Sequence, residues 1–150
     1  MRRGIPLGAA LAAILLTAAP TEAAAPTGSY YGGETPQQWP VVVQIAKNRK
    51  SVTKLVLALT LKCTSADPIV NRDRFDKLKI DGAGEFQDTY GPTTIDNGDG
   101  TTTDYRGSVT GKVTKGKVTA TSRLSGDFYD ATGKLLYTCD SGKVNWTAKP

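Results

Sequence analysis

The stretch Ser51–Cys63, SVTKLVLALTLKC, constrains the fold of this chain more than any other. Its large apolar side chains fall on one parity, at Leu55, Leu57, Leu59, Leu61 and Cys63. A period of two over this length indicates a β-strand with one buried face. A helical interpretation would mix two lysines into the apolar stripe, so it fits the pattern less well. We therefore predict a central strand over residues 51–63.

Short alternating runs separated by Gly, Asn, Asp and Pro follow along most of the chain. They predict an all-β domain of about eight antiparallel strands, with no convincing helix after the N-terminal segment. Nearly all the connections are short turns, which favours a meander, closed as a barrel or folded as a two-sheet sandwich. The alternation lapses over residues 64–74 and 90–100, and we predict loops there. It also changes parity at residues 140–142, where we expect a bulge or a break.

The chain has two cysteines, Cys63 and Cys139. Cys63 ends the predicted central strand, and Cys139 lies in the last predicted strand. In a meander these two positions fall at the same end of the molecule. We therefore predict one disulfide that links the central strand to the last one, as a supplement to the apolar core.

The N-terminal segment has the features of an export signal. Arg2 and Arg3 precede an apolar run over residues 5–19, and small residues follow up to Ala23. The run of about fifteen apolar residues is shorter than the roughly twenty that span a bilayer. We therefore expect a secreted or extracytoplasmic protein that has no membrane association after signal removal. The predicted organisation is a signal peptide at 1–23, a loose lead-in at 24–28 and a single β domain at 29–148.

Composition limits the chemistry that this domain can perform. The chain has no histidine, which removes the usual general base of hydrolases and the commonest zinc ligand. Without residues 1–23, 17 basic and 13 acidic residues remain, spread along the chain. This mild positive charge does not indicate nucleic-acid binding. We find no catalytic, metal-binding or cofactor-binding motif.

These observations favour a non-catalytic exported domain of unknown role that binds an extracellular or envelope ligand without a cofactor. Two alternatives remain open. One is an enzyme that acts on glycans through a carboxylate pair, with Glu34, Glu85 or an aspartate as candidates. The other is a protein inhibitor that presents a loop such as residues 89–103.

The candidate ligand surface consists of cations and one loop tryptophan. The cations could bind an anionic envelope polymer. The alternative is a solvated sheet surface whose lysines oppose aggregation. Trp39, between Gln38 and Pro40 in a predicted loop, could contact carbohydrate. The cations are Lys47, Arg49 and Lys50 in a predicted hairpin turn, with Lys54 and Lys62 on the outer face of the central strand.

Six short motifs together resemble an uncharacterised family of small secreted proteins common in actinobacteria. The most specific is the closing Cys-x-Ser/Thr-Gly-x-Val-x-Trp pattern, found here at Cys139–Trp146. The resemblance implies secretion and a β fold, and it carries no known activity or site residues. The other five motifs are Gly28–Tyr31, Gln38–Val41, Leu55–Cys63, Gly84–Phe86, and Val109–Val113 with Gly116.

Overall fold

A computed structural model describes residues 28–150 of the chain. The predicted signal peptide, and all of the predicted lead-in except Gly28, lie outside the described residues. Residues 28–150 form nine antiparallel strands, which confirms the all-β prediction with one strand more than expected. No helix capable of crossing a membrane occurs in this part of the chain. The strands are β1 (Ser29–Glu34), β2 (Pro40–Ile45), β3 (Ser51–Cys63), β4 (Ile69–Lys79), β5 (Glu85–Asp96), β6 (Thr102–Thr114), β7 (Lys117–Tyr129), β8 (Leu135–Asp140) and β9 (Val144–Lys149).

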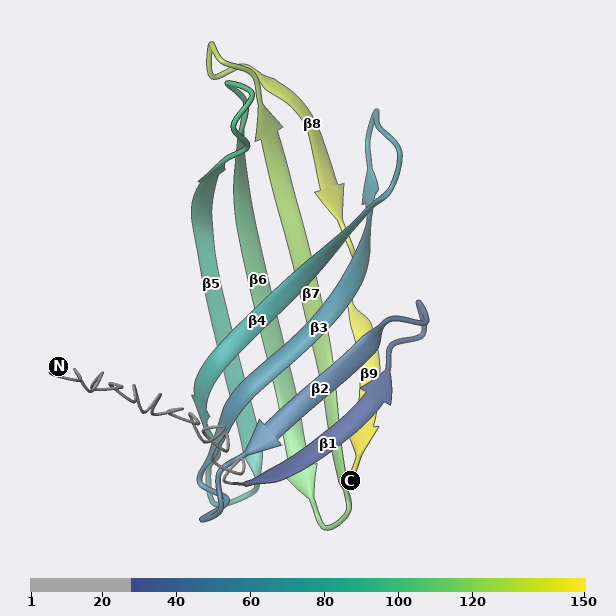
Figure 1. The fold of residues 1–150 in the computed structure, drawn as a ribbon, viewed down its shortest axis with the longest axis vertical. Coiled ribbons are helices and arrows are strands. Elements are labelled where there is room, and N and C mark those ends of the chain that lie inside the picture. The colour runs from purple at the N-terminus through teal and green to yellow at the C-terminus, as the bar shows by residue number, and fades with distance from the viewer. Residues whose placement is uncertain (1–27) are drawn as a thin grey trace, which may run out of the picture.

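Six of the strands close into a barrel, in the order β3-β2-β1-β9-β7-β8 and back to β3. The other three strands lie outside this ring: β4 pairs with β3, β6 pairs with β7, and β5 pairs with β6. In Figure 1, β1–β4 form a slanted layer in front of the steeper strands β5, β6 and β7. Strands that follow one another in the sequence pair with each other, as in a meander, except β4 with β5 and β8 with β9. The fold is therefore a small barrel with one strand added on one side and two on the other.

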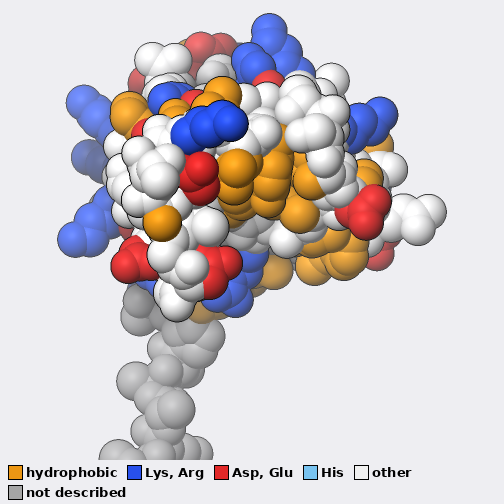
Figure 2. Space-filling model, turned by 90° about the horizontal axis from the view of Figure 1, so that it is seen from above, with side chains coloured by type: hydrophobic (Ala, Val, Ile, Leu, Met, Phe, Trp, Pro, Cys, Tyr) orange, Lys and Arg blue, Asp and Glu red, His pale blue; other side chains and the backbone are white. Residues whose placement is uncertain are grey.

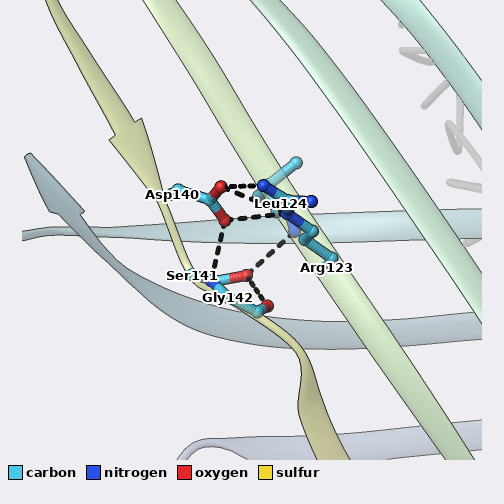
Figure 3. A network of polar contacts seen from close by, with 5 residues as sticks. All are labelled: Arg123, Leu124, Asp140, Ser141 and Gly142. Atoms are coloured by element: carbon cyan, nitrogen blue, oxygen red, sulfur yellow. Dashed lines mark hydrogen bonds and ion pairs between the residues drawn. The ribbon is translucent and has the colours of Figure 1, made fainter.

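The additional strand arises at the predicted break near residue 141. Here the chain leaves β8, which pairs with one half of β7, and enters β9, which pairs with the other half. Figure 3 shows the contacts that hold the break against β7. Ser141 exchanges two hydrogen bonds with the backbone of Leu124, both at 2.9 Å. Asp140 accepts from the Gly142 amide at 2.7 Å and forms an ion pair with Arg123.

The predicted disulfide is present and lies at the seam that closes the barrel. Cys63 and Cys139 are direct partners in the short β3–β8 ladder, with their Cα atoms 4.0 Å apart. Only one further Cα pair, Lys62 with Asp140, belongs to this ladder. Cys139 lies in the penultimate strand, so the disulfide joins β3 to β8 rather than to the last strand.

β3 is buried on one face, as its alternation predicts. Leu55, Leu57, Leu59 and Leu61 are at most 1% exposed, whereas Lys54 is exposed. The buried side chains of both layers meet in a single core. Its largest fully buried members are Ile45, Leu55, Leu57, Leu59, Leu61 and Leu124.

Two segments predicted as loops are strands instead. β4 begins at Ile69 and pairs with β3 residue by residue, although the inward positions Asn71 and Asp73 are polar. β5 continues through a register shift between Tyr90 and Thr93 and stays paired with β6 as far as Asp96. In both cases a long neighbouring strand supplies backbone partners where the apolar alternation fails. The loop considered for an inhibitor is thereby reduced to the tip at residues 97–101.

Two glycines of β6 allow aromatic rings from β5 to lie across the inner face of the sheet. A Cβ atom at Gly107 would come within 2.2 Å of the Tyr90 ring, and one at Gly111 within 2.4 Å of the Phe86 ring. Both pairs are direct cross-strand partners. The rings thus fill the space that side chains at these glycines would occupy. This arrangement places Tyr90 between the two layers.

Candidate ligand-binding site

The candidate site lies between β4 and β5, the two strands at the ends of the sheet. In the described part of the chain β4 pairs only with β3, and β5 only with β6. Side chains bridge these two edges. The Tyr90 hydroxyl donates a hydrogen bond to Asp73 Oδ1 at 2.7 Å. The Tyr90 ring also packs against Phe75 with the ring centroids 5.6 Å apart.

Asp73 is the distinctive polar residue of this region because it is a carboxyl group with 3% exposure. Its Oδ1 accepts from the Tyr90 hydroxyl and from the Arg74 amide at 2.8 Å. Its Oδ2 is buried and has no hydrogen-bond partner among the described residues. A buried polar atom of this kind calls for an explanation, since most such atoms in proteins are paired.

Burial raises the pKa values of both Asp73 and Tyr90. Desolvation raises the pKa of Asp73, and the hydrogen bonds from Tyr90 and Arg74 oppose this effect. The pKa of Tyr90 is also raised, first by burial and then by the adjacent Asp73 carboxylate. Tyr90 therefore stays a hydrogen-bond donor at neutral pH.

Three further aromatic residues continue the site toward one end of the molecule. Phe128 stacks on Tyr137 with centroids 4.6 Å apart and meets Tyr105 edge-on at 6.1 Å. All three are partly buried. Burial raises the pKa of Tyr105, and the neighbouring Tyr137 acts in the same direction. A side-chain hydrogen bond between Tyr105 and Asn71 opposes these effects, and it connects the two aromatic groups because Asn71 lies two residues before Asp73 on β4. We call Asp73, Tyr90, Tyr105, Phe128 and Tyr137 the aromatic site.

Exposed apolar side chains border the same end of the protein. Four of the six large hydrophobic residues that are exposed in the described chain occur at strand ends near the β3–β4, β5–β6 and β7–β8 connections. Figure 1 places these three connections together at the top. Figure 2, which looks down on this end, shows hydrophobic side chains gathered in its middle between polar and charged ones. The four residues are Val70, Ile95, Leu135 and Leu136, each 47–50% exposed.

The cations predicted as a ligand surface do not form one patch. Lys47, Arg49 and Lys50 are exposed in the β2–β3 turn, where the Arg49 guanidinium donates to the Thr114 carbonyl at 3.3 Å. Lys54 and Lys62 are exposed on the outer face of β3. Lys62 follows Lys54 by eight positions, which corresponds to about 26 Å along a strand.

Trp39, the tryptophan considered for carbohydrate contact, lies at the other end of β2 from the cationic turn. Its ring is half-buried, and its indole N–H donates to Thr60 Oγ1 at 2.7 Å. The structure therefore places Trp39 near the Lys62 end of β3, with its only polar group already bonded. The three turn cations and Trp39 are not brought together.

A surface concavity of about 620 Å³ lies elsewhere, on the outer face of β7 and β9 beside the β1–β2 loop. Some of its polar side chains are paired, since Thr121 donates to Asn145 at 2.6 Å and Thr35 Oγ1 accepts from the Trp39 amide at 3.2 Å. The adjoining concavities contain Arg106 and Arg123, and both are neutralised by aspartates. We place the candidate site at Asp73 because the unpaired buried oxygen is there.

Sequence reasoning missed the aromatic site because Asp73 fell in a predicted loop. The pattern did contain a signal. Ile69, Asn71, Asp73 and Phe75 share one parity, and all four are at least partly buried on the inner face of β4. Asn71 and Asp73 thus interrupt an apolar inner face between Ile69 and Phe75. Such a pattern indicates a strand whose inner face carries a polar site.

The described residues contain no cluster of three or more Cys, Asp or Glu residues that could hold a metal ion. The groups available at the site are thus a carboxylate, tyrosine hydroxyls and aromatic rings. Groups of these kinds are the ones that small-molecule sites use to anchor a ligand with an apolar body and a hydrogen-bond donor. No family model matches the chain, and neither a curated protein nor a solved structure is detectably similar to it.

Proposed function

We propose that this protein is an exported, non-catalytic β domain that binds a small organic ligand at the aromatic site. The observation that carries the proposal is Asp73 Oδ2, a buried acceptor without a partner among residues 28–150. Such an atom costs free energy in the unliganded protein, and a ligand donor would recover that cost. Asp73 Oδ2 is thus an acceptor that could take a hydrogen bond from a ligand, since no described side chain donates to it.

The surroundings of Asp73 support the same proposal. Tyr90, Tyr105, Phe128 and Tyr137 offer ring faces and edges to an apolar ligand body. Small-molecule sites commonly combine such apolar walls with a few convergent polar groups. The Cys63–Cys139 disulfide is compatible with an extracytoplasmic location.

Fluorescence titration of the purified protein with Nile red, a neutral apolar dye, tests this proposal. We expect saturable binding of one dye molecule per chain. A double variant, Leu135→Ser with Leu136→Ser, removes apolar surface from the rim, and we expect it to weaken binding about fivefold to tenfold. Val42→Ser is the matched control, because Val42 is 44% exposed on the outer face of β2, away from the site. Equal loss in both variants, or no saturable binding by the wild type, contradicts the proposal.

A further inference from the structure

We infer that the ligand of the aromatic site carries a protonated amine, and that this cation pairs with Asp73 Oδ2. The inference rests on the proposed function and names the chemical class of its ligand. It rests on the burial of the Asp73 carboxyl group, on the absence of an ion pair to it among residues 28–150, and on the Tyr90 and Phe75 rings beside it.

The first step concerns charge. Asp73 is 3% exposed, so its carboxylate is almost completely removed from water. Two neutral donors, the Tyr90 hydroxyl and the Arg74 amide, share Oδ1, and Oδ2 has none. Neutral donors compensate a buried negative charge only in part. A cation placed at Oδ2 would supply both the missing hydrogen bond and the missing charge.

The second step is that the cations nearest in sequence do not fill this role. Arg72 and Arg74 flank Asp73, but successive strand residues point to opposite faces, and both arginines are exposed. The Arg74 guanidinium instead pairs with Asp76, with Nε and Oδ2 2.7 Å apart. No ion pair of Asp73 occurs in the described part of the chain. The counter-charge is therefore left for a ligand.

The third step concerns the rings around Asp73. An ammonium group gains electrostatic attraction from the faces of aromatic side chains, most strongly where water is excluded. Tyr90 lies against both Asp73 and Phe75, and Tyr105 has a side-chain hydrogen bond with Asn71, two residues before Asp73 on the same inner face of β4. Aromatic rings around a carboxylate match an alkylammonium ion, whose charged head and apolar chain need different partners.

A protonated Asp73 is the alternative explanation of the unpaired oxygen. In that state Oδ2 would carry a proton and donate it to an acceptor. The site would then bind a neutral alcohol at least as well as an ammonium ion of the same chain length. A comparison of two such probes separates the two protonation states.

The experiment is displacement of bound Nile red at neutral pH by n-octylammonium and by n-octanol. Both probes have the same apolar chain and differ in charge. A charged hydrogen bond contributes about 1.5–3 kcal/mol, so we expect octylammonium to displace the dye at a concentration at least about tenfold lower than octanol. Asp73→Asn should abolish this difference, so that octylammonium and octanol displace the dye at similar concentrations. The matched control is Asp76→Asn, an exposed aspartate on the outer face of the same strand, which should keep the difference.

The outcomes distinguish this inference from the proposed function. Equal displacement by the two probes in the wild type overturns the inference while the binding site stands. Absence of saturable Nile red binding contradicts the proposed function itself. The wild-type comparison decides the matter even where Asp73→Asn fails to fold. The folding of each variant is checked by its thermal unfolding curve.

Discussion

The side chain of Gln37 is hydrogen-bonded to both backbone groups of Thr60. Its Nε2 donates to the Thr60 carbonyl at 3.0 Å, and its Oε1 accepts from the Thr60 amide at 2.9 Å. Along the same edge of β3, β2 pairs with residues 52–57 and β8 pairs with residues 62–63. Gln37 thus occupies the gap where the barrel passes from one partner strand to the next, and its carboxamide replaces a missing strand residue.

We expect Gln37→Ala to destabilise the fold by about 1–3 kcal/mol, because it leaves a partly buried amide and carbonyl without partners. Gln37→Glu should also destabilise, since it replaces the donor to the Thr60 carbonyl by a second acceptor. Urea unfolding measures both effects. Gln87→Ala, an exposed position on β5, is the control and should change the free energy of unfolding little. Equal stability of the Gln37 and Gln87 variants would show that the carboxamide contributes nothing at this gap.

The Cys63–Cys139 disulfide closes a long loop, with 76 residues of sequence separation. On the chain-entropy estimate, a loop of this length stabilises the fold by about 4 kcal/mol. We therefore expect a double variant, Cys63→Ser with Cys139→Ser, to lose most of that free energy of unfolding. Denaturant unfolding of the oxidised wild type and the variant measures the difference. Unchanged stability would mean that the short β3–β8 ladder closes the barrel unaided.

The fold was largely predictable because its central features depend on alternation alone. Ser51–Cys63 has the same bounds in the sequence pattern and in the structure. The parity change after Cys139 also marked the real break between β8 and β9. The sequence does not distinguish a barrel from a sandwich, because the pairing of β1 with β9 joins two strands far apart in sequence and leaves no local pattern.

The aromatic site was not predictable for a different physical reason. Asn71 and Asp73 face inward where alternation requires apolar residues, so the sequence pattern predicts a loop there. On β5 the chain shifts register beyond Tyr90, which disrupts the period of two. Both departures follow from tertiary pairing with a long neighbouring strand, which overrides local preference. They coincide with the candidate site, as expected where a site is built from residues that do not suit a core.

The raised pKa of Asp73 predicts how its contribution to stability changes with pH. Burial raises the pKa in the folded state above the unfolded value of about 3.9, so the folded state binds the proton more tightly. This contribution is largest below pH 3.9, declines as the pH rises through the interval between the two pKa values, and is constant above it. Asp73→Asn removes the decline. The stability of this variant relative to the wild type should therefore increase with pH over that interval.

Urea unfolding of both proteins from pH 3 to pH 7 measures this difference. Asp140, Asp130 and Asp99 have lowered pKa values and act in the opposite direction, but they are common to both proteins and cancel. Tyr90 and Tyr105 stay protonated over this range because their pKa values are raised from that of an ordinary tyrosine. Parallel pH profiles of the two proteins would show that Asp73 has an ordinary pKa in the fold.

The exposed cations of the β2–β3 turn give the last prediction, which concerns an anionic envelope polymer. Lys47, Arg49 and Lys50 are all exposed in one turn, so their charges can act together on a polyanion. Retention on purified cell wall should then weaken steeply with salt, because the screening length falls from about 10 Å at 0.1 M to about 3 Å at 1 M. A triple variant should be poorly retained even at low salt. Arg49 has a φ of 56°, so asparagine suits this position and serine replaces the two lysines.

A matched triple variant separates this turn from the overall positive charge of the chain. Lys134, Lys143 and Lys149 are exposed elsewhere on the protein, and changing them to serine removes the same number of cations. If the turn binds the polymer, this control should be retained like the wild type at low salt, whereas the turn variant is lost. Equal retention of the two variants would assign these cations to the solvated sheet surface, where lysines oppose edge-to-edge aggregation. Arg72, Lys77 and Lys79 occupy the position where that role is expected, because they are exposed on β4, which has only one partner among the described strands.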